Sequence, residues 1–512
     1  RWEITGEEPP DYSELYSFST NANINELNFK LKPFKYQEFG IKFLIDRLEN
    51  EGMGFICDAV VLGKTIQAIG AMKYFLDSDL VKDIVIVCKK SLKTQWAEEI
   101  NKFVDIGADI YVVEEAKTKR LKTYDKVKAN PGKTITIVNY HALLKDSKIL
   151  KADMVVYDEV HIAKKHDGQI NKACKQITAN ASYCLFMTGT PLMARPEDLY
   201  GIVSIKDKKY FGGSHKKFEE RYLVKSYGRY IQTVGCRNLN ELRDKVQKLI
   251  LRRTANEVAI DLPEVVELTH KLSMDPQQAE ASRMVGERLD EVTDKLDYLS
   301  KISKKSDEDK QEIEKLEGQV KGFIAMQQIV ANNPRLFHFS KSKAIKYGYE
   351  SVTPSANYLS SKYIKLLDIM EELKEEGQKA IIFTKYETVA KHIADFLNGQ
   401  KIRSVCYYGM LNQEDRDNVV NDFKFNEQVS AFVATDAAAE GLNLQIAGTV
   451  IHFDLPFNQA IYDQRNGRAR RAGSKHSTVM SYNLITEGTI DETIYNKIQE
   501  TKTGFEDRKS VV

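Results

Sequence analysis

The chain has 512 residues, of which 42% are hydrophobic and 29% charged, and its formal net charge at pH 7 is +2. This length exceeds what one hydrophobic core organises, so we expect at least two domains of an ordinary folded protein. No stretch reaches the roughly 20 consecutive apolar residues of a membrane helix, which excludes a membrane-spanning chain, and the near-neutral charge confines any nucleic-acid path to a local basic stripe.

Six cysteines are scattered through the chain without a C-x-x-C pair, so neither a zinc site nor a disulfide framework is expected. That pattern suits a reducing compartment. Residues 1–30 are interpreted as an N-terminal extension. Because the chain starts at Arg1 with no initiator Met and no apolar leader, we expect it to be trimmed.

Short β-branched strands alternate with amphipathic helices in a first block, which predicts a parallel α/β sheet. The expected strands are residues 54–57, 84–88, 134–138, 154–157 and 184–187. They are apolar on both faces, as covered parallel strands are. We expect them to form one lobe, a domain over residues 31–255 that includes a helical appendage.

Residues 256–355 are more polar and are predicted to be helical. Apolar residues recur three and four positions apart, as on one face of a helix. They are Leu289, Val292, Leu296 and Leu299, followed by Ile313, Leu316, Val320 and Phe323. We interpret this segment as a helical hairpin inserted between lobes, either a structural arm or a binding element for a protein partner.

A second block, residues 356–486, repeats the alternation of strands and helices. Its expected strands are residues 380–383, 405–408, 431–434, 450–453 and 479–482. It predicts a second lobe, with a closing segment at residues 487–512. The predicted fold class is therefore α/β, with two parallel-sheet lobes and a helical insertion (protrusion) between them.

Gly63, Lys64 and Thr65 follow the first expected strand and open a helical segment. Backbone amides at such a helix start face phosphates. Lys64 would neutralise the β- and γ-phosphates of a nucleotide, and Thr65 would hold magnesium. The full phosphate-loop pattern has a glycine where Asp58 stands, so this match alone is also compatible with chance.

Asp158 and Glu159 stand at the carboxyl end of the strand 154–157, where an α/β sheet places its ligand groups. Asp158 can coordinate magnesium and Glu159 can position and polarise water; a solvated loop pair is the alternative. Thr188, Gly189 and Thr190 end another strand. The hydroxyls of Thr188 and Thr190 could link nucleotide state to a DNA-facing surface, whereas a plain turn is the other interpretation.

Four arginines fall between Gln464 and Arg471, where they repel one another unless anions are near. Arg468 and Arg471 are three residues apart and so share a helix face. Such arginines can stabilise the charge that develops on a γ-phosphate. A generic basic surface patch is the alternative.

In this order and spacing, the motifs resemble helicase superfamily two, and within it the Swi/Snf-type double-stranded DNA translocases. Matching segments are residues 31–44, 62–69, 91–96, 158–161, 188–192, 251–254, 361–362, 434–444, 464–471 and 488–492. The resemblance covers nearly the whole chain from Leu31. It implies two RecA-like lobes, and a brace formed by residues 487–512.

The resemblance also implies site residues, with ATP and Mg²⁺ as cofactors. The catalytic residues would be Lys64, Asp158, Glu159, Arg468 and Arg471. Nucleotide would be bound by Gln37, which reads adenine, with Leu62, Gly63, Lys64, Thr65 and Ile66, and the metal by Thr65 and Asp158. Double-stranded DNA would be contacted by Lys89, Lys90, Ser91, Tyr408, Gly409, Thr435 and Asn443. Coupling would pass through Thr188, Gly189, Thr190, Gly441 and Gln464.

The implied function is DNA-stimulated ATP hydrolysis that drives movement along duplex DNA without strand separation, remodelling or displacing bound protein. A strand-separating helicase and a DNA-binding scaffold deficient in ATP hydrolysis stay open as alternatives. We expect a monomer in the cytoplasm of a prokaryotic or virus-infected cell, or in the nucleus if the source is eukaryotic.

The phosphate loop departs from the family at two positions. Val61 stands where the family has glycine, and Ala59 where it has glutamate. If the position of Val61 requires a positive φ, a β-branched residue there costs roughly 1–3 kcal/mol. The sequence therefore predicts weakened nucleotide binding.

Overall fold

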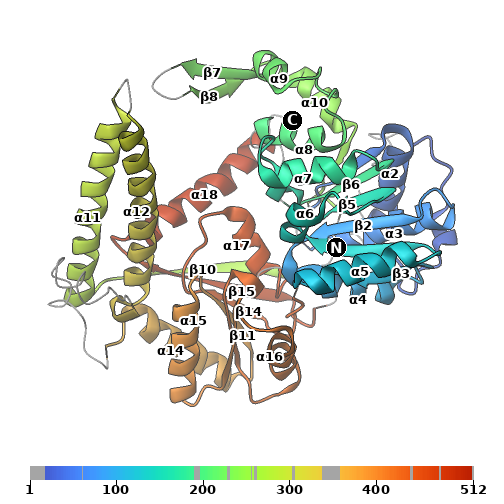
Figure 1. Ribbon diagram of the computed structural model, residues 1–512. Coiled ribbons are helices and arrows are strands. Elements are labelled where there is room, and N and C mark those ends of the chain that lie inside the picture. The colour runs from blue at the N-terminus through green and yellow to red at the C-terminus, as the bar shows by residue number, and fades with distance from the viewer. Residues whose placement is uncertain are drawn as a thin grey trace. The chain divides into compact units, whose positions relative to one another are not determined.

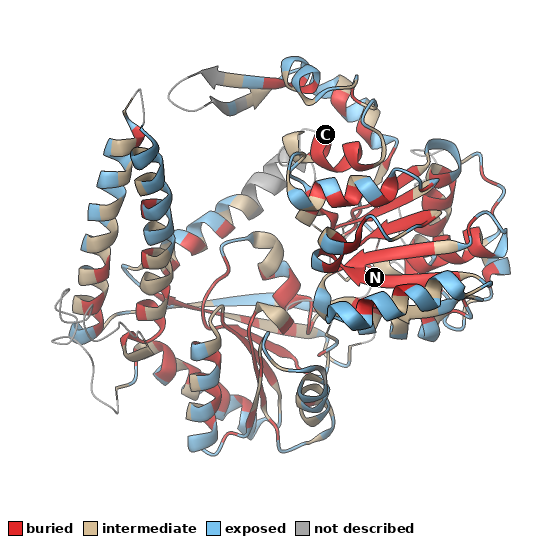
Figure 2. Cartoon of the chain, in the orientation of Figure 1, coloured by how far each residue is buried: buried red, intermediate tan, exposed pale blue. Residues whose placement is uncertain are grey.

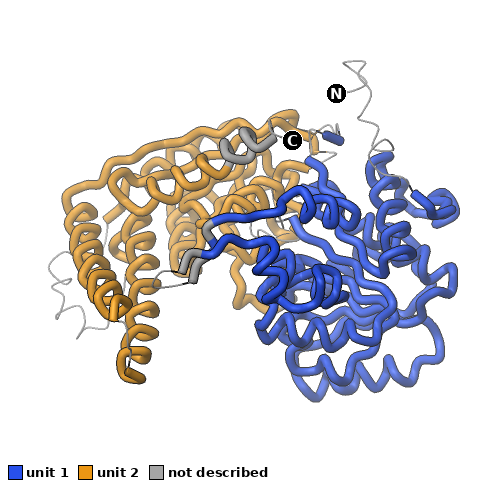
Figure 3. The backbone as a smooth tube through the Cα atoms, turned by 90° about the horizontal axis from the view of Figure 1, so that it is seen from above, with its two compact units in different colours: residues 1–261 blue, residues 262–512 orange. Residues whose placement is uncertain are grey.

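The computed structural model describes residues 18–59, 61–189, 196–227, 231–254, 257–258, 262–302, 306–336, 358–438, 442–471 and 474–509. The chain divides into two compact units, residues 1–261 and 262–512 (Figure 3). Each unit is built around its own parallel sheet (Figure 1). These are the two α/β lobes that the sequence predicts.

The first unit contains a seven-stranded parallel sheet in the order β3-β4-β2-β5-β6-β1-β9. Its strands are β1 (Met53–Ile56), β2 (Asp83–Cys88), β3 (Asp109–Val112), β4 (Thr134–Asn139), β5 (Met154–Tyr157), β6 (Tyr183–Met187) and β9 (Ile250–Leu251). The central strands are buried on both faces, as their continuous apolar runs predict (Figure 2).

Helices cover both faces of this sheet. They are α2 (Lys35–Glu51), α3 (Lys64–Asp77), α4 (Lys93–Phe103), α5 (Lys117–Ala129), α6 (Tyr140–Asp146), α7 (Gln169–Thr178), α8 (Pro196–Lys206), α9 (His215–Tyr222) and α10 (Leu239–Gln247). Phe55 and Val85 pack in one core with residues of α6, α7 and α8. The neighbouring Ile56 and Ile84 pack in the other with α2, α3 and α4, as the two-residue period of strands requires.

Shorter elements complete the first unit. The antiparallel pair β7 (Leu223–Tyr227) and β8 (Ile231–Cys236) forms a separate two-stranded sheet. The described residues of this unit also include the 3₁₀ helices η2 (Ile24–Leu27), η3 (Lys90–Leu92) and η4 (Val160–Ala163). Of these, η3 and η4 directly follow β2 and β5, so they lie at the carboxyl edge of the sheet.

The second unit contains a six-stranded parallel sheet in the order β10-β15-β14-β11-β13-β12. Its strands are β10 (Glu264–Leu272), β11 (Ala380–Phe383), β12 (Ser404–Tyr407), β13 (Ala431–Ala434), β14 (Thr449–His452) and β15 (Thr478–Thr486). Its helices are α11 (Pro276–Ser300), α12 (Asp307–Asn332), α14 (Ser361–Glu375), α15 (Glu387–Gly399), α16 (Gln413–Phe425), α17 (Gln459–Asn466) and α18 (Ile490–Lys509), with 3₁₀ helices η6 (Pro334–Leu336) and η8 (Asp436–Ala438).

The expected helical hairpin is formed by α11 and α12, which run side by side (Figure 1). Asp275 caps the start of α11 and accepts from the amides of Gln277 and Gln278. Ser306 and Asp309 form a capping box at the start of α12. The sequence predicts helix throughout residues 256–355, and this prediction is wrong at its start, because β10 is an edge strand of the second sheet.

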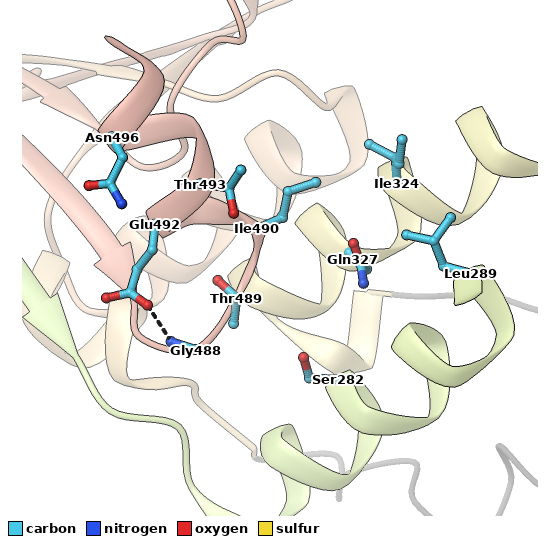
Figure 4. Close-up of a pocket in the computed structure, with 10 residues that line it drawn as sticks. All are labelled: Ser282, Leu289, Ile324, Gln327, Gly488, Thr489, Ile490, Glu492, Thr493 and Asn496. Carbon is cyan, nitrogen blue, oxygen red and sulfur yellow. Dashed lines mark hydrogen bonds between the residues drawn. The ribbon is translucent and has the colours of Figure 1, made fainter. Parts of the chain in front are cut away.

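A pocket of about 660 Å³ lies in the second unit between this hairpin and the start of α18 (Figure 4). Its lining includes Leu289, Ile324 and Gln327 from the hairpin and Thr489 and Ile490 from the chain entering α18. None of the predicted site residues lines it. Among the described residues, no helix has the length and apolarity to cross a membrane.

Candidate active site

The loop between β1 and α3 carries the predicted phosphate-binding residues. Gly63 precedes α3 at φ +70, and a side-chain carbon there would lie 2.5 Å from Nε2 of Gln37. Leu62 is fully buried and anchors the loop in the lobe. Val61 has φ +77, so the β-branched residue does stand in the left-handed region, as the family glycine would.

Lys64 is the first residue of α3, and its side chain folds back into the loop. Nζ donates to the carbonyl oxygens of Asp58 at 2.9 Å and Ala59 at 3.2 Å. Thr65 and Ile66 follow in the first turn of the helix. The loop therefore presents an ammonium group, a hydroxyl and helix N-terminal amides together, which is the donor set that phosphates require.

Gln37 lies against this loop from α2. Its Nε2 donates to Leu62 O at 3.3 Å and to the Tyr36 hydroxyl at 3.0 Å. Its Oε1 accepts from the Phe34 amide at 3.0 Å. The structure thus places Gln37 beside the phosphate loop, while adenine recognition stays a prediction.

Asp158 follows β5 at the same carboxyl edge of the sheet as the phosphate loop. Trp96 Nε1 donates to its Oδ2 at 3.0 Å, and the Tyr140 hydroxyl donates to its carbonyl at 2.8 Å. Asp158 and Thr65 offer a carboxylate and a hydroxyl, and such oxygen ligands suit Mg²⁺ that is also bound by phosphates. Among the described residues, no cluster of three acidic, histidine or cysteine side chains forms a metal site without a substrate.

Glu159 is held by two neighbours at the start of η4. His161 Nδ1 lies 3.1 Å from its Oε2, and the Thr188 hydroxyl donates to the same oxygen at 3.4 Å. Burial acts to raise the pKa of Glu159, but the hydrogen bond and charge of His161, together with Lys64 and Lys89, outweigh burial and lower it. Glu159 is therefore a carboxylate at neutral pH.

The predicted coupling residues of this lobe lie at the end of β6. Thr188 is fully buried and contacts both Glu159 and His161, whose Nδ1 lies 3.2 Å from the Thr188 hydroxyl. Gly189 follows it. Thr190 lies outside the described residues. A direct link between β6 and the carboxylate of Glu159 thus exists.

Lys89 follows β2 and precedes η3, of which Lys90 and Ser91 are the first two residues. Lys90 is exposed, and its two neighbours are partly exposed. Lys89 follows β2 at the carboxyl edge of the sheet, and its charge is one of those that lower the pKa of Glu159.

In the second unit, Arg468 and Arg471 converge on one carbonyl group. Arg468 Nη1 donates to Leu442 O at 2.9 Å and Arg471 Nη2 donates to it at 3.2 Å. Arg468 Nε also donates to the carbonyl of Gln464 at 3.2 Å. The structure therefore brings the two arginines together, but the prediction that they share a helix face is wrong, because α17 (Gln459–Asn466) ends before Arg468.

A third arginine of this run has a structural role. Arg465 is fully buried, and its Nη2 lies 2.7 Å from Asp436 Oδ1 while its Nη1 donates to Asp454 O at 2.7 Å. The chain's own carboxylates therefore supply part of the negative charge that the four arginines need.

The remaining predicted DNA contacts follow strands of the second sheet. Thr435 comes directly after β13, and Tyr408 and Gly409 come after β12. Gly409 and Asn443 are exposed, and Lys391 Nζ lies 4.2 Å from the centre of the Tyr408 ring. Gly441 lies outside the described residues.

Sequence reasoning did not assign a role to Arg253, Asp58 or Gln67. The structure buries all three beside the phosphate loop, where Arg253 forms an ion pair with Asp58 at 2.6 Å. The only signal was the pair Arg252 and Arg253 in a segment that resembles the family, and nothing in the sequence distinguished the buried arginine from the exposed one.

Two domain families match this chain. Residues 36–336 match the SNF2-related domain, and residues 361–473 match the helicase conserved C-terminal domain. The Caenorhabditis elegans SWI/SNF-related matrix-associated actin-dependent regulator of chromatin subfamily A-like protein 1 homolog is 25% identical, over 96% of this chain and 65% of the relative. The human DNA annealing helicase and endonuclease ZRANB3 is 25% identical, over 96% of this chain and 42% of its own length.

Among solved structures, the Sulfolobus solfataricus SWI2/SNF2 ATPase core in complex with dsDNA is 25% identical. The match covers 94% of this chain and 93% of that chain, with a TM-score of 0.42. The chain spans less than two thirds of the length of the two curated relatives.

Two RecA-like lobes, the second of which matches the helicase conserved C-terminal domain, define the class of helicase-like proteins. Because the SNF2-related domain matches residues 36–336 of the 512 residues, the chain belongs to the SNF2-related family.

Proposed function

We propose that this chain hydrolyses ATP to move along double-stranded DNA without separating its strands, and so remodels or displaces bound protein. The observation that carries the proposal is the shared edge of the first sheet, which holds both the loop with Lys64 and the pair Asp158 and Glu159. A basic loop beside a carboxylate pair is the arrangement that phosphoryl transfer to water requires.

Each residue at this edge has a proposed role. Lys64 neutralises the β- and γ-phosphates, and Gln37 recognises adenine. Thr65 and Asp158 hold Mg²⁺, which neutralises phosphate charge when it is bound. Glu159, kept ionised by its neighbours, orients the attacking water and polarises it.

We assign two further positive charges of the proposed ATP site to arginines of the second lobe. Arg468 and Arg471, which both donate to Leu442 O in the structure, are proposed to stabilise the γ-phosphate in the transition state. Thr188 in the first lobe, with Gly441 and Gln464 in the second, couples this event to movement.

DNA is bound mainly through its phosphates, by Lys89, Lys90 and Ser91 on the first lobe and by Tyr408, Gly409, Thr435 and Asn443 on the second. Contacts of this kind give little sequence preference and strong salt dependence. We further propose that the chain acts as a monomer in a reducing cytoplasm, which is consistent with its six free cysteines.

The test compares phosphate release with and without duplex DNA. We expect stimulation by DNA, and loss of turnover in the Lys64→Ala variant. Absence of stimulation, with Lys64→Ala equal to the parent, would refute the proposal. Triplex displacement without strand displacement is expected; strand displacement alone would instead indicate a strand-separating helicase.

A second candidate function is a DNA-binding scaffold that does not turn over ATP. The observation that favours it is the positive φ of Val61 in the phosphate loop. Calorimetric titration with magnesium and ATP distinguishes this scaffold from an ATP-hydrolysing translocase, because the scaffold would bind DNA but not the nucleotide. The Val61→Gly, Ala59→Glu double variant then shows how much turnover the altered loop has lost.

A further inference from the structure

The phosphate loop is held by a strand that lies far from it in the sequence. β9 pairs with β1, so that Ile56 is in register with Leu251. Beyond the paired residues the two segments stay together, because the amide of Ala59 donates to Arg253 O at 2.9 Å. The first residues of the loop are therefore fixed to the segment that carries Arg253.

The side chain of Arg253 adds a second and stronger link. Its Nη2 lies 2.6 Å from Asp58 Oδ2, its Nε donates to Oδ1 at 3.1 Å, and its backbone amide donates to the same Oδ1 at 3.0 Å. The two side chains are 1% and 0% exposed. A paired guanidinium and carboxylate in this fork geometry fix both the position and the orientation of Asp58.

Gln67 extends this link to the far end of the loop. Arg253 Nη2 donates to Gln67 Oε1 at 2.8 Å, and Gln67 Nε2 donates to Asp58 Oδ2 at 3.2 Å and to Leu62 O at 3.3 Å. The fit is close enough that a side-chain carbon at Gly40 would lie 1.7 Å from Gln67 Oε1. Both ends of the loop are thus tied, directly or through Gln67, to one guanidinium group.

This arrangement explains how the loop tolerates Val61 at φ +77. A residue in a sparsely populated conformation persists only where its surroundings over-determine it. The same loop supplies the carbonyls of Asp58 and Ala59 that receive the Lys64 ammonium.

We propose that Arg253 is a positioning residue for nucleotide binding, which holds the strained loop so that Lys64 and the helix amides are placed for a nucleoside triphosphate. The inference rests on the proposed ATP site. Arg253 acts through Asp58 and Gln67 and does not itself contact the nucleotide.

A purely structural role is the competing explanation, and the first lobe contains a matched control. Arg120 Nε lies 2.6 Å from Asp146 Oδ2, with side chains 6% and 7% exposed. This pair joins α5 to α6 and has no contact with the phosphate loop. Breaking either buried pair leaves an uncompensated charge and lowers stability, but only the Arg253 pair is expected to change nucleotide affinity.

The experiment is calorimetric titration of a non-hydrolysable ATP analogue with magnesium, at a temperature where each full-length variant is folded. We expect Arg253→Met to raise the Kd about ten-fold or more, which corresponds to 1.4 kcal/mol or more, and Arg120→Met to leave it within about two-fold. Equal affinities of these two variants would overturn the inference. Absence of binding by the parent would instead refute the ATP site itself.

A rescue experiment distinguishes a positioning role of Arg253 from a general loss of structure in the variant. In the Val61→Gly background, which relieves the strain, Arg253→Met is expected to raise the Kd clearly less than it does in the parent, because the two sites are coupled. Purely additive effects would contradict the role proposed here. If Arg253→Met does not fold, Arg253→Lys and Asp58→Asn take its place, since the first loses only the fork geometry and the second only the charge.

Discussion

Val61 is the residue at which this chain departs most from its family in a physical sense. Its φ of +77 places a β-branched side chain where glycine is favoured. The sequence predicted strain on the condition that this position has a positive φ, and the structure meets that condition. It could not show what holds the strained loop, since Arg253 and Asp58 are 195 residues apart.

Replacing Val61 with glycine is expected to stabilise the first lobe. Relief of roughly 1–3 kcal/mol of strain exceeds the roughly 0.5–1 kcal/mol that glycine loses in chain entropy, so the free energy of unfolding should rise by about 1 kcal/mol. Urea denaturation, monitored by tryptophan fluorescence, measures this change in the free energy of unfolding. Val112→Gly in β3, where φ is not positive, is the control and should destabilise. A fall in stability for Val61→Gly would contradict the strain.

Glu159 gives a prediction about pH. Burial favours a higher pKa, but His161, Lys64 and Lys89 hold the pKa below its ordinary value of 4.5. The stabilisation from these partners is therefore complete above about pH 5, and it is lost as pH falls through the lowered folded-state pKa. Protonation of Glu159 should produce no acid limb in kcat between about pH 5 and 8.

The His161→Asn variant tests this assignment. It removes the strongest group that lowers the pKa of Glu159, so the acid loss of kcat should move to higher pH. Profiles of kcat at saturating ATP measure the shift. His141→Asn, at an exposed position on α6, should leave the profile unchanged, and identical profiles for both variants would count against the role of His161.

At the scale of elements, hydrophobic periodicity predicted the central strands and the helical hairpin. It missed β3, an edge strand of the first sheet with no fully buried residue, β10, whose burial alternates irregularly because it is an edge strand, and β9, which has only two residues. Such strands are defined by their partners β4, β15 and β1 rather than by their own composition.

A buried polar network in the second unit joins elements that the sequence treats as separate. Lys362 from α14 pairs with Asp491 from α18 at 2.6 Å and donates to Asn332 Oδ1 of α12 at 3.0 Å. Asn332 in turn donates to Asp454 Oδ2 at 2.9 Å, and the Asp454 carbonyl accepts from Arg465 at 2.7 Å. The hairpin, α18 and the arginine-bearing α17 are thus linked through side chains that water does not reach.

Breaking this network should destabilise the second unit. Lys362→Met leaves Asp491 buried without its cation, and we expect a loss of about 3–5 kcal/mol in the free energy of unfolding. Lys310→Met on the exposed face of α12, where the pair with Asp307 is solvated, should lose less than about 1 kcal/mol. Urea denaturation measures the free energy of unfolding of both variants. Equal losses of stability would show that the buried network contributes no more than a surface ion pair.

At the scale of the whole molecule, the hairpin of α11 and α12 carries none of the groups proposed to hydrolyse ATP, so its role can be tested separately. Its base is fixed by the apolar contacts of Val285, Phe323 and Val330, whereas its tip carries exposed charges. None of the proposed catalytic residues lies on it. The hairpin is therefore a candidate for converting hydrolysis into displacement.

Replacing residues 290–320 with a short glycine-serine link retains that base. We expect DNA-stimulated phosphate release within about two-fold of the parent, because no charged group near the phosphates changes, and a loss of triplex displacement. A double replacement of Lys295 and Glu312, which pair across the two helices at 2.8 Å, serves as the control and should keep both activities. Normal triplex displacement by the shortened chain would exclude this role.

The link between Arg253 and Asp58 also has a consequence for synthesis of the chain. Their separation of 195 residues corresponds to roughly 10–40 s at common translation rates. During that interval β1 and α3 have left the ribosome, but Arg253, whose guanidinium forms the ion pair with Asp58, has not yet been synthesised. The carboxyl edge of the first sheet, where the loop with Lys64 lies, is thus completed late in synthesis. A nascent chain that stops before Arg253 would expose an incomplete sheet to proteases and chaperones.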